Sequence, residues 1–283
     1  MPETSRGKNK MVIIIGSILG AYLVFVVGMF ALQRMMIYHP SSTPPASVTK
    51  SGVPEMQEVH AKTNDGLELL GWFAPPKKDK PLLILFHGNA GSIADRAHKA
   101  RRYLDWGYGV LLAEYRGFGG NPGSPSEDGL FADARAWLAV AQDNGFGPDK
   151  VVLYGESLGT GPAVRMASEM AENKTPVAAV VLEAPYTTLV DVAQHHYPYT
   201  PAKWLIRDAY DSLSRIGRIY APLIVIHGTK DPTIPIMFGK VLFAAAAEPK
   251  LAHWVKEAGH NNLYDFAAAE VIDNFLAREI PVR

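Results

Sequence analysis

The hydrophobic residues of this chain fall into short continuous runs separated by stretches with helical spacing. A run of about four to eight apolar residues between turn signals is typical of a buried strand, whereas a period near 3.6 residues is typical of a helix. The expected strands are residues 67–74, 82–86, 109–115, 151–154, 177–182, 223–226 and 251–257. The expected helices are residues 93–106, 127–141, 237–247 and 263–278. This alternation predicts an α/β fold in which helices flank a mostly parallel central sheet.

One apolar stretch near the N-terminus is longer than any of these runs. Residues 11–32 carry no charge and would extend roughly 33 Å as a helix at about 1.5 Å per residue, which is enough to cross a bilayer. A cleaved signal peptide is the alternative, but its apolar region is usually about 7 to 15 residues long and ends in a small-x-small site. Neither feature is present in this sequence. We therefore expect a short tail at 1–10 and a transmembrane anchor at 11–33.

The charges around this stretch predict its orientation. Three basic residues, Arg6, Lys8 and Lys10, precede it, and only Arg34 follows it closely. Because positive charges near a span stay in the cytoplasm, we expect a cytoplasmic N-terminus and an extracytoplasmic body, which in a bacterium would face the periplasm. The alternative is that the apolar N-terminus is an interaction helix and that the body is cytoplasmic.

The rest of the chain divides into a connector and a body. Residues 37–55 contain four prolines among several serines and threonines, so we expect an extended linker at 34–56. The α/β domain then occupies residues 57–283. Within it, residues 186–220 are rich in Tyr, Trp and His and exceed the usual length of a crossover connection, which predicts a small helical lid.

Composition excludes several classes of function. The chain has 28 basic and 28 acidic residues, and this balance gives no indication of a nucleic-acid partner. It has no cysteine, which excludes disulfides, thiolate nucleophiles and zinc-thiolate sites. Sequence motifs for zinc or calcium are missing too, so we expect neither a metal nor an organic cofactor. Nothing in the sequence indicates an obligatory protein partner.

A serine lies between two glycines directly after the expected strand at 151–154. The segment Gly155-Glu156-Ser157-Leu158-Gly159 fits the G-x-S-x-G pattern of a tight strand-to-helix turn, which presents the serine hydroxyl at the edge of the sheet. The serine of such a turn has a strained backbone, and the residues two before and two after it crowd neighbouring backbone. Gly155 and Gly159 therefore predict a nucleophile elbow at Ser157.

Two further side chains complete a catalytic pattern. Ligands of a parallel sheet bind beyond the carboxyl ends of its strands, and a serine nucleophile needs a histidine base that a carboxylate orients. Asp231 and His260 each follow a later strand, in the chain order serine, acid, histidine. We expect Ser157, Asp231 and His260 to form a catalytic triad. Glu183, which follows the strand at 177–182, is the alternative acid.

The negative oxygen of an acyl-transfer intermediate needs preorganised N–H donors. One usually comes from the residue after the nucleophile and another from the loop after an early strand. Leu158 is in the first position. The strand at 82–86 leads into His87-Gly88-Asn89, and we expect the backbone N–H of Asn89 to be the second donor. His87 is expected to hold this loop by hydrogen bonding and not to act as a second base.

Five segments of this sequence carry a family resemblance. They are HGNAG (87–91), YRGFGGNPGSPSEDGLFADA (115–134), GESLGTGPA (155–163), HGTKDPTIP (227–235) and GHNNL (259–263). In this order they resemble the Bem46-like group of the α/β-hydrolase superfamily, which includes the mammalian α/β-hydrolase domain-containing proteins 12, 13 and 17. The resemblance implies an α/β-hydrolase fold and a membrane-tethered serine hydrolase of acyl esters or thioesters, in some relatives of lipids or acylated proteins. The N-terminal cysteine cluster of the palmitoyl-protein thioesterase branch is missing from this chain.

These features predict acyl transfer to water through an acyl-enzyme on Ser157. The anchor and the lid aromatics Tyr197, Tyr199 and Trp204 favour a carboxylesterase or lysophospholipase that acts near the bilayer. Packing of the lid onto the body is an equal explanation for these aromatics. A serine peptidase with the same triad is the second enzymatic hypothesis, and a non-catalytic binding protein on the same fold is the third.

Overall fold

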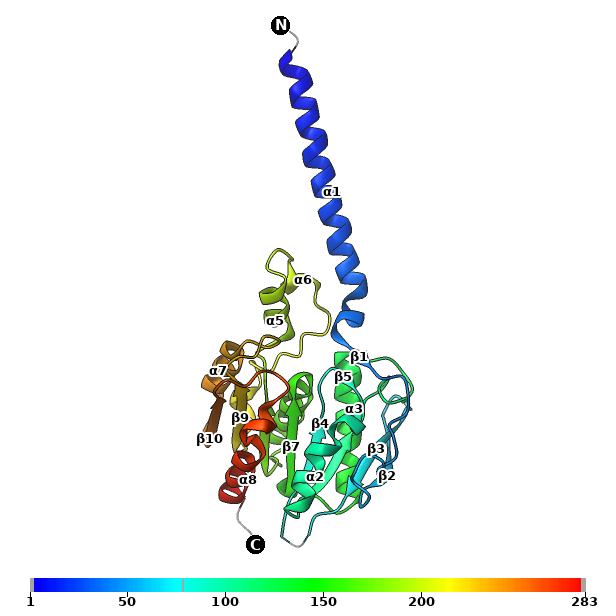
Figure 1. The fold of residues 1–283 in the computed structure, drawn as a ribbon, viewed down its shortest axis with the longest axis vertical. Helices are drawn as coiled ribbons and strands as arrows, with labels where there is room; N and C mark the ends of the chain where they lie inside the picture. The colour runs from blue at the N-terminus through cyan, green and yellow to red at the C-terminus, as the bar shows by residue number, and fades with distance from the viewer. Residues whose placement is uncertain (1–2, 78, 281–283) are drawn as a thin grey trace.

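The computed structural model describes residues 3–77 and 79–280 of the chain (Figure 1). Its main sheet has the strand order β10-β9-β8-β7-β4-β6-β3-β2. The strands are β2 Gln57–Lys62, β3 Glu68–Ala74, β4 Leu82–Phe86, β6 Gly109–Ala113, β7 Val151–Glu156, β8 Ala179–Glu183, β9 Leu223–Gly228 and β10 Lys250–Val255. All pairs from β6 across to β10 are parallel, whereas β3 is antiparallel to β2 and to β6. The prediction of a mostly parallel central sheet is confirmed.

Helices cover both faces of this sheet. They are α2 Ala97–Asp105, α3 Glu127–Asp143, α4 Thr160–Glu172, α7 Ile236–Ala245 and α8 Ala268–Glu279. Ile84 of β4 packs in a core with α3, α4 and α7, and the next residue, Leu85, packs in a second core with α2 and α8. Successive strand residues face opposite sides of the sheet, and all of β4 is buried. A strand covered on both faces has no polar side, so its sequence is an unbroken apolar run.

The predicted elements differ from the observed ones mainly at their ends. The expected helices at 93–106 and 263–278 each begin with a 3₁₀ turn, at Ile93–Arg96 and Leu263–Phe266, before the α-helical part. The sequence did not predict β2, whose residues QEVHAK are largely exposed. This strand lies at the edge of the sheet, where polar side chains replace the apolar run of a central strand.

The prediction of an extended linker at residues 34–56 is wrong, because this segment contains regular structure and packs on the body. Its first residues continue helix α1, which spans Glu3–Ile37, and β1 His39–Pro40 then pairs in parallel with β5 Ala90–Gly91. Tyr38 and Val53 are buried. The prolines prevent a longer helix or strand, but Tyr38 before them and Val53 among them pack on the body and attach the segment to it.

Helix α1 projects from the body in Figure 1. Within it, the stretch Asn9–Ile37 is long and apolar enough to cross a membrane. Residues 9–25 are exposed, whereas Val26 and Gln33 are buried against the rest of the chain. The helix is therefore a candidate membrane span whose last turns belong to the packed body.

The predicted lid, residues 186–220, contains α5 Leu189–His196 and α6 Ala202–Leu205. We call these residues the lid segment. Figure 1 shows α5 and α6 beside the C-terminal half of α1. Tyr199 and Trp204 are 88% and 80% exposed, so these two aromatics do not pack the lid segment onto the body.

Candidate active site

Ser157 lies at the turn from β7 into α4. Its φ is +52°, a left-handed conformation that residues other than glycine seldom adopt. A Cβ on Gly155 would lie 2.5 Å from the Cα of Thr160. A Cβ on Gly159 would overlap the carbonyl of Phe86. The close approach of backbone on both sides therefore requires the two glycines and holds the serine in its strained conformation.

The three side chains predicted to act together meet at the carboxyl end of the sheet. Nε2 of His260 lies 3.0 Å from Oγ of Ser157, and Nδ1 of His260 lies 2.7 Å from Oδ2 of Asp231. Asp231 follows β9 and His260 follows β10, so two adjacent parallel strands bring them to the same edge. This arrangement can pass the serine proton to the imidazole while the carboxylate orients the ring.

The carboxylate of Asp231 is buried and has several donors. Its Oδ1 accepts hydrogen bonds from the backbone N–H groups of Thr233 and Ile234, both at 2.8 Å. Nε2 of His227 lies 3.3 Å from Oδ2. Burial alone would raise the pKa of Asp231, but hydrogen bonds from His227 and His260 hold that pKa well below its usual range. His227 was not predicted as a partner of Asp231, and its position at the end of β9 is the only signal of this role in the sequence.

Glu183, the alternative acid, is engaged elsewhere. Both of its carboxylate oxygens lie 2.8 Å from Nζ of Lys99, and one accepts a hydrogen bond from the Tyr154 hydroxyl at 2.5 Å. Its described hydrogen bonds thus go to Lys99 and Tyr154, while the described carboxylate partner of His260 is Asp231. The structure brings Asp231, and not Glu183, to the histidine.

Lys99 also belongs to a buried charged group next to the serine. Its Nζ lies 2.7 Å from Oε2 of Glu156, the residue before Ser157, and Arg96 lies 2.8 Å from Oε1 of the same carboxylate. Burial opposes ionisation of Glu156, but the positive charges of Lys99 and Arg96 hold its pKa well below the usual range. The residue at the variable position of the elbow is therefore fixed by two cations.

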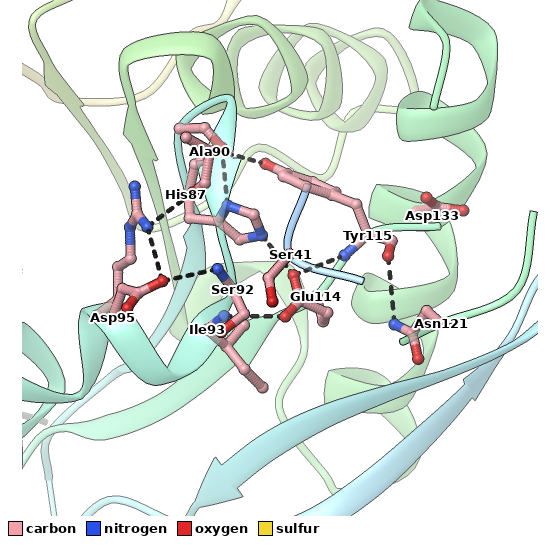
Figure 2. Close-up of polar contacts among 12 residues, drawn as sticks. Ser41, His87, Ala90, Ser92, Ile93, Asp95, Glu114, Tyr115, Asn121 and Asp133 are labelled. Carbon is pink, nitrogen blue, oxygen red and sulfur yellow. Dashed lines mark hydrogen bonds and ion pairs between the residues drawn. The ribbon is translucent and has the colours of Figure 1, made fainter. Parts of the chain in front are cut away.

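A second buried network supports the loop after β4 (Figure 2). Nε2 of His87 lies 2.7 Å from Oε1 of Glu114, and its Nδ1 lies 2.8 Å from the carbonyl oxygen of Gly88. Glu114 also accepts a hydrogen bond from the backbone N–H of Ile93 at 2.9 Å. The Tyr115 hydroxyl donates to the carbonyl of His87 at 3.1 Å. These contacts agree with the expectation that His87 holds the loop in place.

Asn89 lies in this loop, close to the serine. A Cβ on Gly88 would lie 3.5 Å from the Cβ of Ser157, so the loop passes directly beside the elbow. Asn89, Ser157 and Leu158 line one cavity. The side-chain amide of Asn89 donates to the carbonyl of Ile37 at 2.7 Å, which joins the loop to the end of α1.

Ser157 lines two cavities of different character. The first has a volume of about 210 Å³ and is lined mostly by apolar side chains of α1 and the lid segment, among them Phe30 and Val192. The second has a volume of about 160 Å³ and is lined mostly by polar and charged side chains, among them Arg96 and His260. The site can therefore hold an apolar group and a polar group next to the serine at the same time.

His195 and His196 are adjacent at the end of α5. The rings of His195 and His196 are nearly perpendicular, and His196 bonds through Nε2 to the carbonyl of Thr233 at 2.9 Å. Among the described residues there is no group of three or more His, Asp or Glu side chains placed to hold a metal ion.

Comparisons with known proteins agree with this architecture. Residues 81–212 match the family model of the α/β-hydrolase fold. The chain is 39% identical over 257 residues to an uncharacterised protein of Mycobacterium tuberculosis, with 89% of this chain and 88% of that protein covered. It is 32% identical over 207 residues to human α/β-hydrolase domain-containing protein 17B, with 71% of this chain and 68% of that protein covered.

Solved structures show the same fold at lower identity. An esterase of Pyrococcus furiosus is similar with a TM-score of 0.68 and 21% identity, and the match covers 86% of this chain and 99% of that one. An esterase of Rhodococcus is similar with a TM-score of 0.61 and 16% identity, over 81% of this chain and all of that one. The sheet order, the elbow turn and the curated relatives lead to one conclusion. This chain belongs to the α/β-hydrolase superfamily and, within it, to the Bem46-like group.

Proposed function

We propose that this protein is a serine hydrolase that cleaves carboxylic esters or thioesters through an acyl-enzyme on Ser157. The observation that carries the proposal is the hydrogen-bonded series from Ser157 through His260 to Asp231, with distances of 3.0 and 2.7 Å. Such a series makes the hydroxyl nucleophilic at neutral pH, because the imidazole takes its proton and the carboxylate stabilises the resulting charge. The ionised state of Asp231 supports the same role.

In the proposed reaction, His260 takes the proton of Ser157 while Oγ attacks the carbonyl carbon. The backbone N–H groups of Leu158 and Asn89 stabilise the negative oxygen of the tetrahedral intermediate. His260 then gives the proton to the leaving alcohol or thiol as the C–O or C–S bond breaks. In the second half, His260 takes a proton from water while the hydroxide attacks the acyl-enzyme, and His260 then returns the proton to Oγ of Ser157 as the bond from Oγ to the acyl carbon breaks and the carboxylic acid leaves.

We further propose that residues 11–33 of α1 anchor the enzyme in a bilayer. The length and apolar character of the helix over Asn9–Ile37 and the exposure of residues 9–25 support this proposal. The basic residues before the span favour a cytoplasmic N-terminus and an extracytoplasmic body. The apolar cavity between α1 and the lid segment favours lipid esters, such as lysophospholipids, as substrates.

Hydrolysis of nitrophenyl esters from acetate to palmitate by the detergent-solubilised full chain tests the chemistry. Ser157→Ala is expected to lower kcat/KM by about a thousandfold or more, and Ser124→Ala, on an exposed loop, serves as the matched control. A fluorophosphonate should form a P–O bond to Oγ of Ser157 with loss of fluoride, which mass spectrometry locates. Unchanged turnover in Ser157→Ala contradicts the proposal. Ser157-dependent cleavage of aminoacyl amides, with little activity on esters, would favour the peptidase hypothesis.

A further inference from the structure

The end of the candidate membrane span forms part of the wall of the apolar cavity. Phe30, Gln33 and Ile37 of α1 line the same cavity as Ser157. The opposite wall comes from α5 and α6 of the lid segment, with Ala193 among its residues. One long apolar helix thus runs from the proposed bilayer to the cavity that contains the proposed catalytic serine.

The lid segment is fastened to this helix at several points. Gln33 donates from its side chain to the carbonyl of Leu205 at 3.1 Å and accepts from the N–H of Arg207 at 2.8 Å. Arg34 forms a two-pronged pair with Asp208, at 2.9 and 3.1 Å. These bonds join positions more than 170 residues apart in the chain. The lid segment therefore keeps a fixed place along the axis of α1.

Another contact places the tip of the lid segment, residues 197–201 between α5 and α6, closer to the N-terminus of α1. The hydroxyl of Tyr22 donates to the carbonyl of Tyr199 at 2.7 Å. From Tyr22 to Ile37 the helix rises roughly 22 Å at about 1.5 Å per residue. A hydrocarbon core of roughly 30 Å needs about 20 helical residues, and every window of that length within Asn9–Ile37 contains Tyr22. If α1 crosses the bilayer, the tip of the lid segment lies at the depth of the acyl chains.

The chemistry of this tip suits such a position. Backbone polar groups in lipid must find partners within the protein. Pro198 and Pro201 have no N–H, the N–H of Thr200 donates to the carbonyl of Tyr197 at 3.0 Å, and Tyr22 satisfies the carbonyl of Tyr199. The exposed aromatic side chain of Trp204 precedes Leu205, which bonds to Gln33 at the end of the proposed anchor, and aromatic residues are enriched at the boundary between headgroups and acyl chains.

We infer that the tip of the lid segment lies within the leaflet on the body's side, and that the cavity between the lid segment and α1 takes a long acyl chain directly from that leaflet. The acyl chain lies along Phe30 and Ala193, with its carbonyl at Ser157. The polar part of the ester faces the second cavity, which is lined by Arg96 and His260. The substrate class is a bilayer-resident ester with one long acyl chain and a polar alcohol. This inference rests on the proposed function for the reaction itself but not for the binding of the chain.

The absence of native cysteine makes the depth of the lid segment directly measurable. A nitroxide attached at Tyr199→Cys in lipid nanodiscs is expected to be relaxed more by oxygen than by a water-soluble nickel chelate. A label at Leu23→Cys, on the exposed face of α1, gives the lipid reference, and a label at Asn173→Cys, after α4, gives the aqueous one. A Tyr199→Cys label that matches the Asn173→Cys label would overturn the inference.

Capture of an acyl chain tests the cavity without relying on catalysis. The Ser157→Ala chain in nanodiscs is irradiated with a monoacylglycerol whose palmitoyl chain carries a diazirine. Crosslinks are expected within residues 29–37 and 189–206. Adding Ala193→Phe, which fills the cavity, should reduce them at least fivefold, and Ala31→Phe, on an exposed position of α1, should leave them unchanged. Equal crosslinking in the two variants, with unaltered thermal unfolding of both, would overturn the inference.

The unmodified chain separates this inference from the proposed function. Release of the palmitoyl acid from the same probe by the wild-type chain, and not by Ser157→Ala, supports the hydrolase proposal. Crosslinks at the expected residues without any Ser157-dependent release would contradict the proposed reaction and still support the acyl-chain site. Ser157-dependent hydrolysis of acetate esters, together with crosslinking that Ala193→Phe does not reduce, would support the reaction and overturn the acyl-chain site.

Discussion

The ammonium of Lys99 lies 2.8 Å from both carboxylate oxygens of Glu183. Both groups are buried, and each would be costly to leave without its partner. This pair lies at the end of β8, one strand away from Asp231, which follows β9. Two buried carboxylates at neighbouring strand ends thus have different partners, a lysine in one case and the proposed catalytic histidine in the other.

Exchanging each acid for its amide should separate these two roles. Asp231→Asn is expected to lower kcat about ten-thousandfold, because the amide no longer fixes the tautomer and charge of His260. Glu183→Gln is expected to keep kcat within about tenfold but to lower the free energy of unfolding by about 3 kcal/mol, since it removes one partner of a buried ion pair. Ester hydrolysis and chemical unfolding of both variants provide the measurement. Equal losses of kcat would contradict the assignment of Asp231.

Acid should destabilise the protein partly through Asp231. The pKa of this group is held well below its ordinary value of about 3.9, so its contribution to stability is present above that value and is lost as the pH falls through the folded-state pKa. Below about pH 4, the free energy of unfolding of the wild type should therefore fall more steeply than that of Asp231→Asn. Urea unfolding in detergent from pH 7 to pH 3 measures this difference. Parallel curves would show that the folded state does not favour the ionised carboxylate.

The elbow should tolerate no side chain at its second glycine. Gly159→Ala would drive a methyl group into the carbonyl of Phe86, and the relaxation must move the backbone next to Ser157. We expect the free energy of unfolding to fall by about 1–3 kcal/mol. We also expect kcat to fall, because the shifted backbone displaces Ser157. Gly20→Ala, where an added Cβ meets nothing within 4 Å, is the control. Full activity of Gly159→Ala would show that the turn can shift without disturbing the serine.

The attachment of the lid segment to α1 should depend on Asp208. This buried carboxylate accepts hydrogen bonds from Arg34 and from the Tyr38 hydroxyl, the latter at 3.1 Å. Asp208→Ala is expected to lower the free energy of unfolding by about 2 kcal/mol and to speed trypsin cleavage after Lys203 and Arg207. Cleavage is followed by mass spectrometry of the detergent-solubilised chain. Glu58→Ala, on the exposed face of the edge strand β2, should change neither quantity, and an unchanged cleavage rate in Asp208→Ala would mean that the remaining contacts suffice.

Local pattern was enough to predict the central sheet and the positions of the proposed triad. An unbroken apolar run such as Leu82–Phe86 is typical of a strand covered on both faces. Because parallel strands bring their carboxyl ends to one edge, the residues that follow each run could be expected to lie together. The glycines at 155 and 159 were predictable for the same reason, because backbone crowding follows from the tightness of the turn.

Contacts between distant parts of the chain could not be predicted in this way. Lys99 lies on a helix with ordinary amphipathic spacing, and nothing local indicates that it reaches Glu156 and Glu183. His227 lies at the end of a predicted strand, and its contact with Asp231 depends on the conformation of the turn between the two residues. The packing of α1 on the lid segment depends on hydrogen bonds that link residues 33 and 34 to residues 205–208. Pairs so far apart in the chain cannot be predicted from the spacing of residue types.

The part of the apolar cavity wall that α1 forms has a consequence for drug discovery. A catalytic fragment cut after Ile37, the obvious route to a soluble reagent, would lack Phe30, Gln33 and Met36, all of which line the cavity. Inhibitors selected against such a fragment would be shaped to an open trough that the intact enzyme does not have. Screening on the complete chain in detergent or nanodiscs avoids that bias, and compounds that gain potency only there are expected to occupy the cavity lined by α1.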